Sequence, residues 1–93
     1  MRTIWKFPIK PGKFNIEMPA ESCILDVQVQ NNNPFFWAEV DTEQPNKEIR
    51  RFETFGTGHK LPDNVYAADY RGTFQLGPLV FHLYEWNGTG KDS

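Results

Sequence analysis

Apolar and polar residues alternate with a period of two along several short stretches of the chain. The odd-numbered residues of 23–30 are apolar, whereas most of the even-numbered ones are polar. The same period recurs over 13–18 and 70–76. Because successive side chains of a strand point to opposite faces, each stretch is predicted to be a half-buried β-strand.

Further segments alternate less cleanly but are rich in β-branched and aromatic residues. These segments are 2–7, 35–40, 48–55 and 79–86. Turn signals such as Asn31-Asn32-Asn33-Pro34 and Gly77-Pro78 separate them. No stretch of about ten or more residues carries the spacing of an amphipathic helix. We therefore expect an all-β fold, a small sandwich or half-open barrel of about six to seven mostly antiparallel strands.

The length of the chain, 93 residues, suits one domain. We expect residues 1–86 to form that single β domain and residues 87–93 to be a disordered polar tail. The segment 79–86 is apolar on both faces. Because a small two-layer domain has difficulty covering both faces of a strand, we also expect a homo-oligomer.

Charge and apolar runs exclude several classes of partner. The net charge of −2 is nearly balanced and no basic stripe is present, so nucleic acid is not an expected partner. No segment approaches the roughly 18 apolar residues of a membrane span, and the N-terminus lacks the apolar run of a signal peptide. We expect a cytoplasmic protein without a membrane partner.

The side chains that usually carry chemistry are scattered. Cys23, His59 and His82 lie on separate segments without paired spacing, so no metal site is expected. Cys23 shares the apolar face of 23–30, which predicts a buried, inert thiol. No nucleophile elbow is present, and the carboxylates fit polar strand faces or turns. We expect no catalytic residues, no cofactor and no enzyme activity.

The segment 56–62 is the feature with a specific binding mechanism. Its two glycines, one residue apart, allow positive φ and could turn backbone N–H groups outward into an anion-binding nest. An arginine of the preceding strand could add a guanidinium fork. The candidate ligand-binding residues are Arg50, Arg51, Gly56, Thr57, Gly58, His59 and Lys60. The alternative is a tight bend that Leu61-Pro62 packs down.

The order of short motifs along nearly the whole chain resembles an uncharacterised family of short tailed-phage and prophage proteins. The motifs are Ile4-Trp5-Lys6-Phe7-Pro8, Val27-Gln28-Val29-Gln30, Trp37-Ala38-Glu39-Val40-Asp41, Arg51-Phe52, Gly56-Thr57-Gly58-His59-Lys60-Leu61-Pro62, Gly72-Thr73-Phe74-Gln75-Leu76 and Leu79-Val80-Phe81-His82-Leu83. The Gly-Thr-Gly-His stretch followed by Leu-Pro is the most specific of them. The resemblance implies the cytoplasm of an infected bacterial host as the setting.

Small phage proteins of this kind often counter host defences, some by sequestering nucleotide-derived immune signals. By that analogy we expect a non-enzymatic phage accessory protein that binds a phosphorylated, nucleotide-like small molecule at the 56–60 loop. One alternative is a protein-binding inhibitor of a host factor, or a minor virion component, acting through an aromatic surface. Another is a hydrolase whose site the sequence does not reveal. A ligand binder should place the loop and an arginine around a concave pocket.

Overall fold

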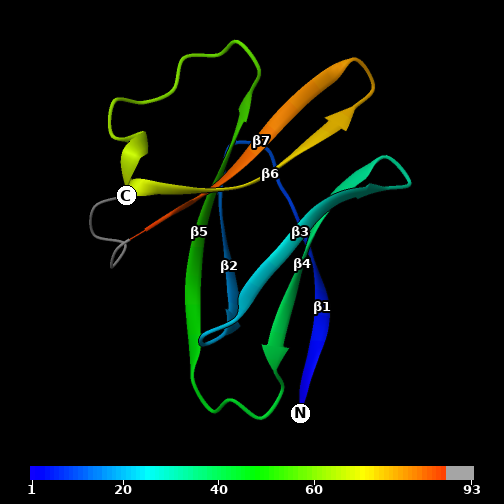
Figure 1. Ribbon diagram of the computed structural model, residues 1–93, viewed down its shortest axis with the longest axis vertical. Helices are drawn as coiled ribbons and strands as arrows, with labels where there is room; N and C mark the ends of the chain where they lie inside the picture. The colour runs from blue at the N-terminus through cyan, green and yellow to red at the C-terminus, as the bar shows by residue number, and fades with distance from the viewer. Residues whose placement is uncertain (88–93) are drawn as a thin grey trace.

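The computed structural model describes residues 1–87, which form two antiparallel β-sheets that pack face to face (Figure 1). The strands are β1 (Arg2–Pro8), β2 (Lys13–Pro19), β3 (Cys23–Gln30), β4 (Asn33–Asp41), β5 (Lys47–Gly56), β6 (Ala68–Leu76) and β7 (Leu79–Trp86). One sheet has the order β1-β4-β3 and the other β2-β5-β7-β6. The predicted all-β fold is confirmed. The predicted tail lies outside the described residues except for Asn87.

Four phenylalanine rings in contact form the centre of the core between the two sheets. Phe36 of β4 and Phe52 of β5 are almost fully buried, and their ring centroids lie 5.0 Å apart. Phe7 stacks on Phe36 at 5.2 Å, and Phe14 stacks on Phe52 at 5.3 Å. Aromatic pairs at such distances contribute about 0.5–1.5 kcal/mol each beyond the area they bury. The rings therefore hold the two sheets together with few residues.

The sheets approach each other most closely where β3 passes β6. A Cβ added to Gly72 would lie 2.6 Å from a methyl carbon of Val27, so this position admits only glycine without a shift of the neighbouring strand. Val27 and Phe74 are buried on the two sides of this contact. The close approach closes one edge of the sandwich.

The alternation predicted for 23–30 is interrupted by a bulge between Ile24 and Asp26. Because one additional residue moves all preceding side chains to the other face, Ile24 turns toward the core while Cys23 and Leu25 are exposed. Val27 keeps its expected buried place. The prediction that Cys23 is a buried thiol is therefore wrong.

A cluster of charged side chains lies on the inner face of the four-stranded sheet. The carboxylate of Glu85, whose side chain is 8% exposed, accepts hydrogen bonds from Arg50 of β5 and Arg71 of β6. The Nη2 atoms of the two arginines lie 2.9 Å and 2.8 Å from Glu85 Oε1. Arg50 also donates to the carbonyl of Ser22 at 2.7 Å. The hydrogen bond to Glu85 raises the pKa of Arg50 above its ordinary value.

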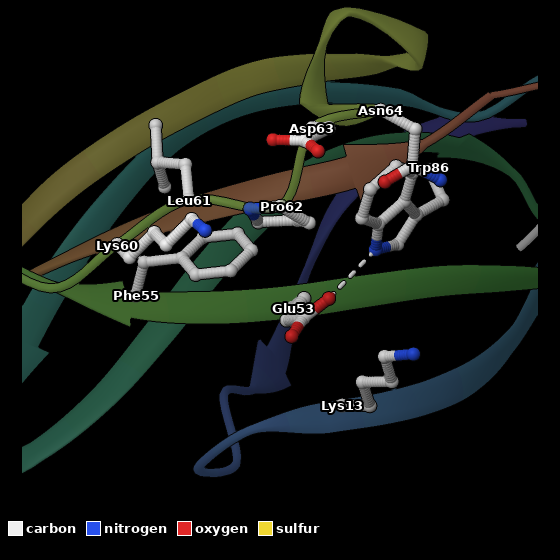
Figure 2. A pocket seen from close by; sticks show the side chains of 9 residues that line it. All are labelled: Lys13, Glu53, Phe55, Lys60, Leu61, Pro62, Asp63, Asn64 and Trp86. Carbon is white, nitrogen blue, oxygen red and sulfur yellow. Dashed lines mark hydrogen bonds between the residues drawn. The ribbon is translucent and has the colours of Figure 1, made fainter.

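Strand β7 is central, between β5 and β6. The segment 57–67, which ends in the short 3-10 turn η1 (Val65–Ala67), connects β5 to β6. It passes across the outer face of β5 and β7, as Figure 2 shows for residues 60–64. His82, Tyr84 and Trp86 on this face are half-buried. The second apolar face of β7 is thus partly covered by the same chain, and the homo-oligomer stays a prediction.

Candidate functional site

The outer face of the four-stranded sheet carries the cationic and aromatic side chains that could hold a ligand. In the pairing of β5 with β7, Arg51 is opposite Trp86, Glu53 is opposite Tyr84 and Phe55 is opposite His82. Paired residues of an antiparallel sheet point to the same face. The neighbouring strand β2 adds Lys13, which pairs with Glu53.

Three hollows follow one another along this face. The cationic hollow, of about 250 Å³, lies at Arg51 and Asn15. The central hollow, of about 400 Å³, is walled by Lys60 and by residues 61–64 of the connecting segment (Figure 2). The aromatic hollow, also of about 250 Å³, lies at the 56–59 loop beside His82.

Neighbouring hollows share lining residues. Lys13 and Trp86 line both the cationic and the central hollow. Phe55 and Leu61 line both the central and the aromatic hollow. The three hollows therefore adjoin one another, and we call them together the outer groove.

Charge is distributed unevenly along the outer groove. Within residues 1–87, the cationic hollow is lined by Lys13 and Arg51 and by no carboxylate. In the central hollow, Lys13 and Lys60 are accompanied by the carboxylates Glu53 and Asp63 (Figure 2). An anion is therefore favoured most strongly in the cationic hollow.

Trp86 is held in a fixed orientation between the cationic and central hollows. Its indole Nε1–H donates to Glu53 Oε1 at 3.0 Å, which is drawn as the dashed line in Figure 2. The indole is half-buried, so part of the ring is covered and part is accessible. A ring fixed in this way offers a flat surface to a planar ligand with little loss of side-chain entropy on binding.

The loop after β5 is a tight turn. Gly58 has a φ of +86°, as expected for a glycine that permits a left-handed turn. However, the N–H of Thr57 donates to the Val80 carbonyl at 3.0 Å, and the N–H of His59 donates to the Gly56 carbonyl at 3.1 Å. These two amides are used within the fold, so neither contributes to the predicted anion-binding nest.

A chain of hydrogen bonds links this loop to β7 and β6 through His82. Thr57 Oγ1 lies 2.7 Å from His82 Nε2, and Thr73 Oγ1 lies 2.9 Å from His82 Nδ1. The hydroxyl of Tyr70 bonds to that of Thr73, and Thr57 Oγ1 donates to the Val80 carbonyl at 3.3 Å. A neutral imidazole with its proton on Nε2 satisfies every donor of the chain. The imidazole thereby ties the loop to the sheet.

The comparison with protein families covers almost the whole chain. Residues 1–92 match the family model described as Domain of unknown function (DUF7352). The chain belongs to the DUF7352 family. Comparison of the chain with curated proteins and with solved structures gave no match. The expectation of an uncharacterised family is confirmed for this DUF7352 member, and its phage origin stays a prediction.

The structure brings most of the predicted ligand-binding residues of this DUF7352 member to the outer groove, but not to one point. The residues Gly56, Thr57, Gly58 and His59 line the aromatic hollow, Lys60 the central hollow and Arg51 the cationic hollow. Arg50 points to the opposite, inner face, where Glu85 and the Ser22 carbonyl engage it. The prediction of Arg50 as a ligand-binding residue therefore has no support in the fold.

Several groove residues of the DUF7352 fold were not recognised in the sequence. These are Lys13, Phe55, Tyr84 and Trp86. The alternation of apolar and polar residues predicts which side chains of one strand share a face. It does not predict that β5 pairs with β2 and with β7, which is what brings these four residues together. The sequence indicated His82 as a candidate metal ligand and as part of one face of 79–86, but not as a hydrogen-bonding partner of the 56–60 loop. The hydroxyls that bond to it lie nine residues before it and 25 residues before it in the sequence.

Metal sites and membrane-spanning helices can be assessed for residues 1–87 of the DUF7352 chain. Within this range, no three side chains of the His, Cys, Asp or Glu type lie together in a way that could hold a metal ion. No helix in the same range has the length and apolar character needed to cross a membrane.

Proposed function

We propose that this DUF7352 protein binds a phosphorylated, nucleotide-like small molecule in the outer groove. The observation that carries the proposal is the convergence of Lys13, Arg51 and Trp86 on the cationic hollow. These residues come from β2, β5 and β7, three neighbouring strands of one sheet. A site on rigid strands is held in place before the ligand arrives, which lowers the entropic cost of binding.

The two cations and the indole ring complement different parts of a nucleotide. A guanidinium fork matches the geometry of phosphate oxygens, and a lysine ammonium adds a point charge. The face of an aromatic ring stacks on a base, a contact worth about 1–3 kcal/mol. We assign the doubly charged terminal phosphate to the cationic hollow because Glu53 and Asp63 offset the charges of Lys13 and Lys60 in the central hollow.

Binding without chemistry agrees with the setting that the sequence resemblance implies. A phage accessory protein that sequesters a nucleotide-derived host immune signal needs affinity rather than turnover. In that role the protein acts in the cytoplasm of an infected bacterial host. The rigid outer groove supports this proposal, since tight retention of a small ligand depends on a preformed site.

Isothermal titration tests the proposal with a panel of mono-, di- and cyclic nucleotides and ADP-ribose derivatives. We expect at least one member to bind to the wild type. Lys13→Ala and Arg51→Ala should each weaken that binding about ten- to a hundredfold, because each removes a charge-assisted pair worth about 1.5–3 kcal/mol. Lys47→Ala is the matched control. It removes an exposed cation of β5 about 13 Å from Arg51 along the strand, and it should leave the affinity unchanged.

A protein-binding inhibitor or minor virion component is the second candidate. It is favoured by large apolar side chains that remain exposed, among them Ile4 at 57%, Leu25 at 50% and Tyr66 at 86%. The aromatic rings Phe35 and Trp37 contribute less, because the ammonium group of Lys6 lies 4.4 Å and 5.8 Å from their centroids. Absence of heat from the entire nucleotide panel would favour this candidate over the first.

A further inference from the structure

The aromatic hollow differs chemically from the cationic hollow at the other end of the outer groove. Its lining residues include Phe55, Tyr84, His59 and His82, and none of them is Lys, Arg, Asp or Glu. Its volume of about 250 Å³ is below the roughly 300–1,000 Å³ of complete small-molecule sites. It is therefore suited to one uncharged part of a larger ligand and poorly suited to a phosphate.

The walls of the aromatic hollow are fixed by contacts within the protein. Phe55 and Tyr84 meet edge to face with centroids 5.6 Å apart. Hydroxyls bond to both ring nitrogens of His82. The ring of His59 packs over Gly56, where an added Cβ would lie 2.9 Å from it. Flat side chains in fixed positions, with hydroxyl and imidazole groups between them, are suited to a planar heterocycle that also forms hydrogen bonds.

The aromatic hollow and the Trp86 ring lie at different positions along β5 and β7. Trp86 is opposite Arg51, and His82 is opposite Phe55, four residues farther along β5. At 3.3 Å per residue the separation along the strand is about 13 Å. The central hollow joins the two places, and Lys60 lies beside it (Figure 2). A ligand that fills both ends thus needs two planar rings and a connection of about that length that passes Lys60.

We infer that the outer groove takes a dinucleotide-like molecule, an inference that rests on the proposed function. The terminal phosphate binds between Lys13 and Arg51, and the first base stacks on Trp86. The bridging phosphate passes Lys60, and the second base enters the aromatic hollow. The terminal phosphate and the two bases then meet surfaces of matching charge and shape. The bridging phosphate carries a single charge, and it passes Lys60 in a hollow where two cations and two carboxylates balance.

The test compares AMP, ADP and the linear dinucleotide pApA by isothermal titration. We expect pApA to bind at least about tenfold more tightly than AMP, because a second base gains a stacking site. ADP adds charge without a second ring, so it controls for the additional phosphate and should bind within a few-fold of AMP.

Two variants of the aromatic hollow complete the test. His59→Ala removes one wall, and Gly56→Ala displaces the same ring through its Cβ. Both should bring the ratio of the pApA affinity to the AMP affinity close to one. Equal binding of AMP and pApA by the wild type would overturn the inference. A preference for pApA that survives both variants would overturn it too. Either result would leave the proposed function standing. Absence of binding by AMP, ADP and pApA would overturn the inference, and absence of heat from the whole nucleotide panel as well would overturn the proposed function.

Discussion

At Gly58 the backbone φ is +86°, in the left-handed region that side chains with a Cβ rarely adopt. At Gly56 the constraint is different, because the ring of His59 occupies the space where a Cβ would lie. The first constraint was predictable from the Gly-Thr-Gly spacing alone. The second depends on where the imidazole packs, so it is visible only in the folded loop.

Gly58→Val should destabilise the protein by about 1–3 kcal/mol, because a β-branched residue is strained at positive φ. Gly58→Asn is the matched control and should cost less, since asparagine tolerates this region. Urea unfolding of both variants measures the difference. Equal stability of the valine variant and the wild type would contradict the turn geometry.

The thiol of Cys23 is exposed, so we expect it to be reactive in the native protein. Because the bulge at Leu25 turns Cys23 outward, native protein should react with a thiol reagent about as fast as unfolded protein does. Cys23→Ala should change the free energy of unfolding by no more than about 0.5 kcal/mol, as is usual for surface positions. Labelling that requires unfolding would show that the thiol is buried and that the bulge is absent.

The strands themselves were largely predictable from the sequence. The alternation over 13–18 falls within β2, and the apolar run 79–86 coincides with β7. The alternation over 70–76 falls within β6, but a bulge between Tyr70 and Gly72 turns Tyr70 to the opposite face. The bulge at Leu25 was not predictable, because a bulge depends on pairing with a distant strand and leaves the local alternation intact. The outer groove was missed for the same reason, since it requires β2, β5 and β7 to be neighbours.

The paired charges of Arg50, Arg71 and Glu85 on the inner face join β5, β6 and β7, so we expect them to stabilise the four-stranded sheet. Glu85→Gln leaves the guanidinium of Arg50 buried without its counter-charge, so it should cost about 3 kcal/mol or more. Glu48→Gln is the control, since the exposed carboxylate of Glu48 lies 3.5 Å from the same arginine and should contribute little. Urea unfolding checks both. An unchanged midpoint for Glu85→Gln would mean that the cluster does not stabilise the sheet.

In the whole molecule, stability and the candidate binding surface depend on different faces of the sheets. Their inner faces form the core around Phe36 and Phe52. The outer face of the four-stranded sheet, together with the segment 57–67, forms the outer groove. A ligand in that groove contacts residues from three strands and one loop, so its binding should stabilise the sheet and the loop together.

The three tryptophans allow a direct test of nucleotide binding in the outer groove. Trp86 is the tryptophan that lines this groove, whereas Trp5 and Trp37 belong to β1 and β4 of the other sheet. In ¹⁵N-labelled protein each indole N–H gives its own NMR signal. Titration with AMP and pApA should shift the signal of Trp86, whose N–H donates to Glu53, and leave those of Trp5 and Trp37 in place. An unmoved Trp86 signal at millimolar nucleotide, or shifts confined to Trp5 and Trp37, would contradict binding in the outer groove.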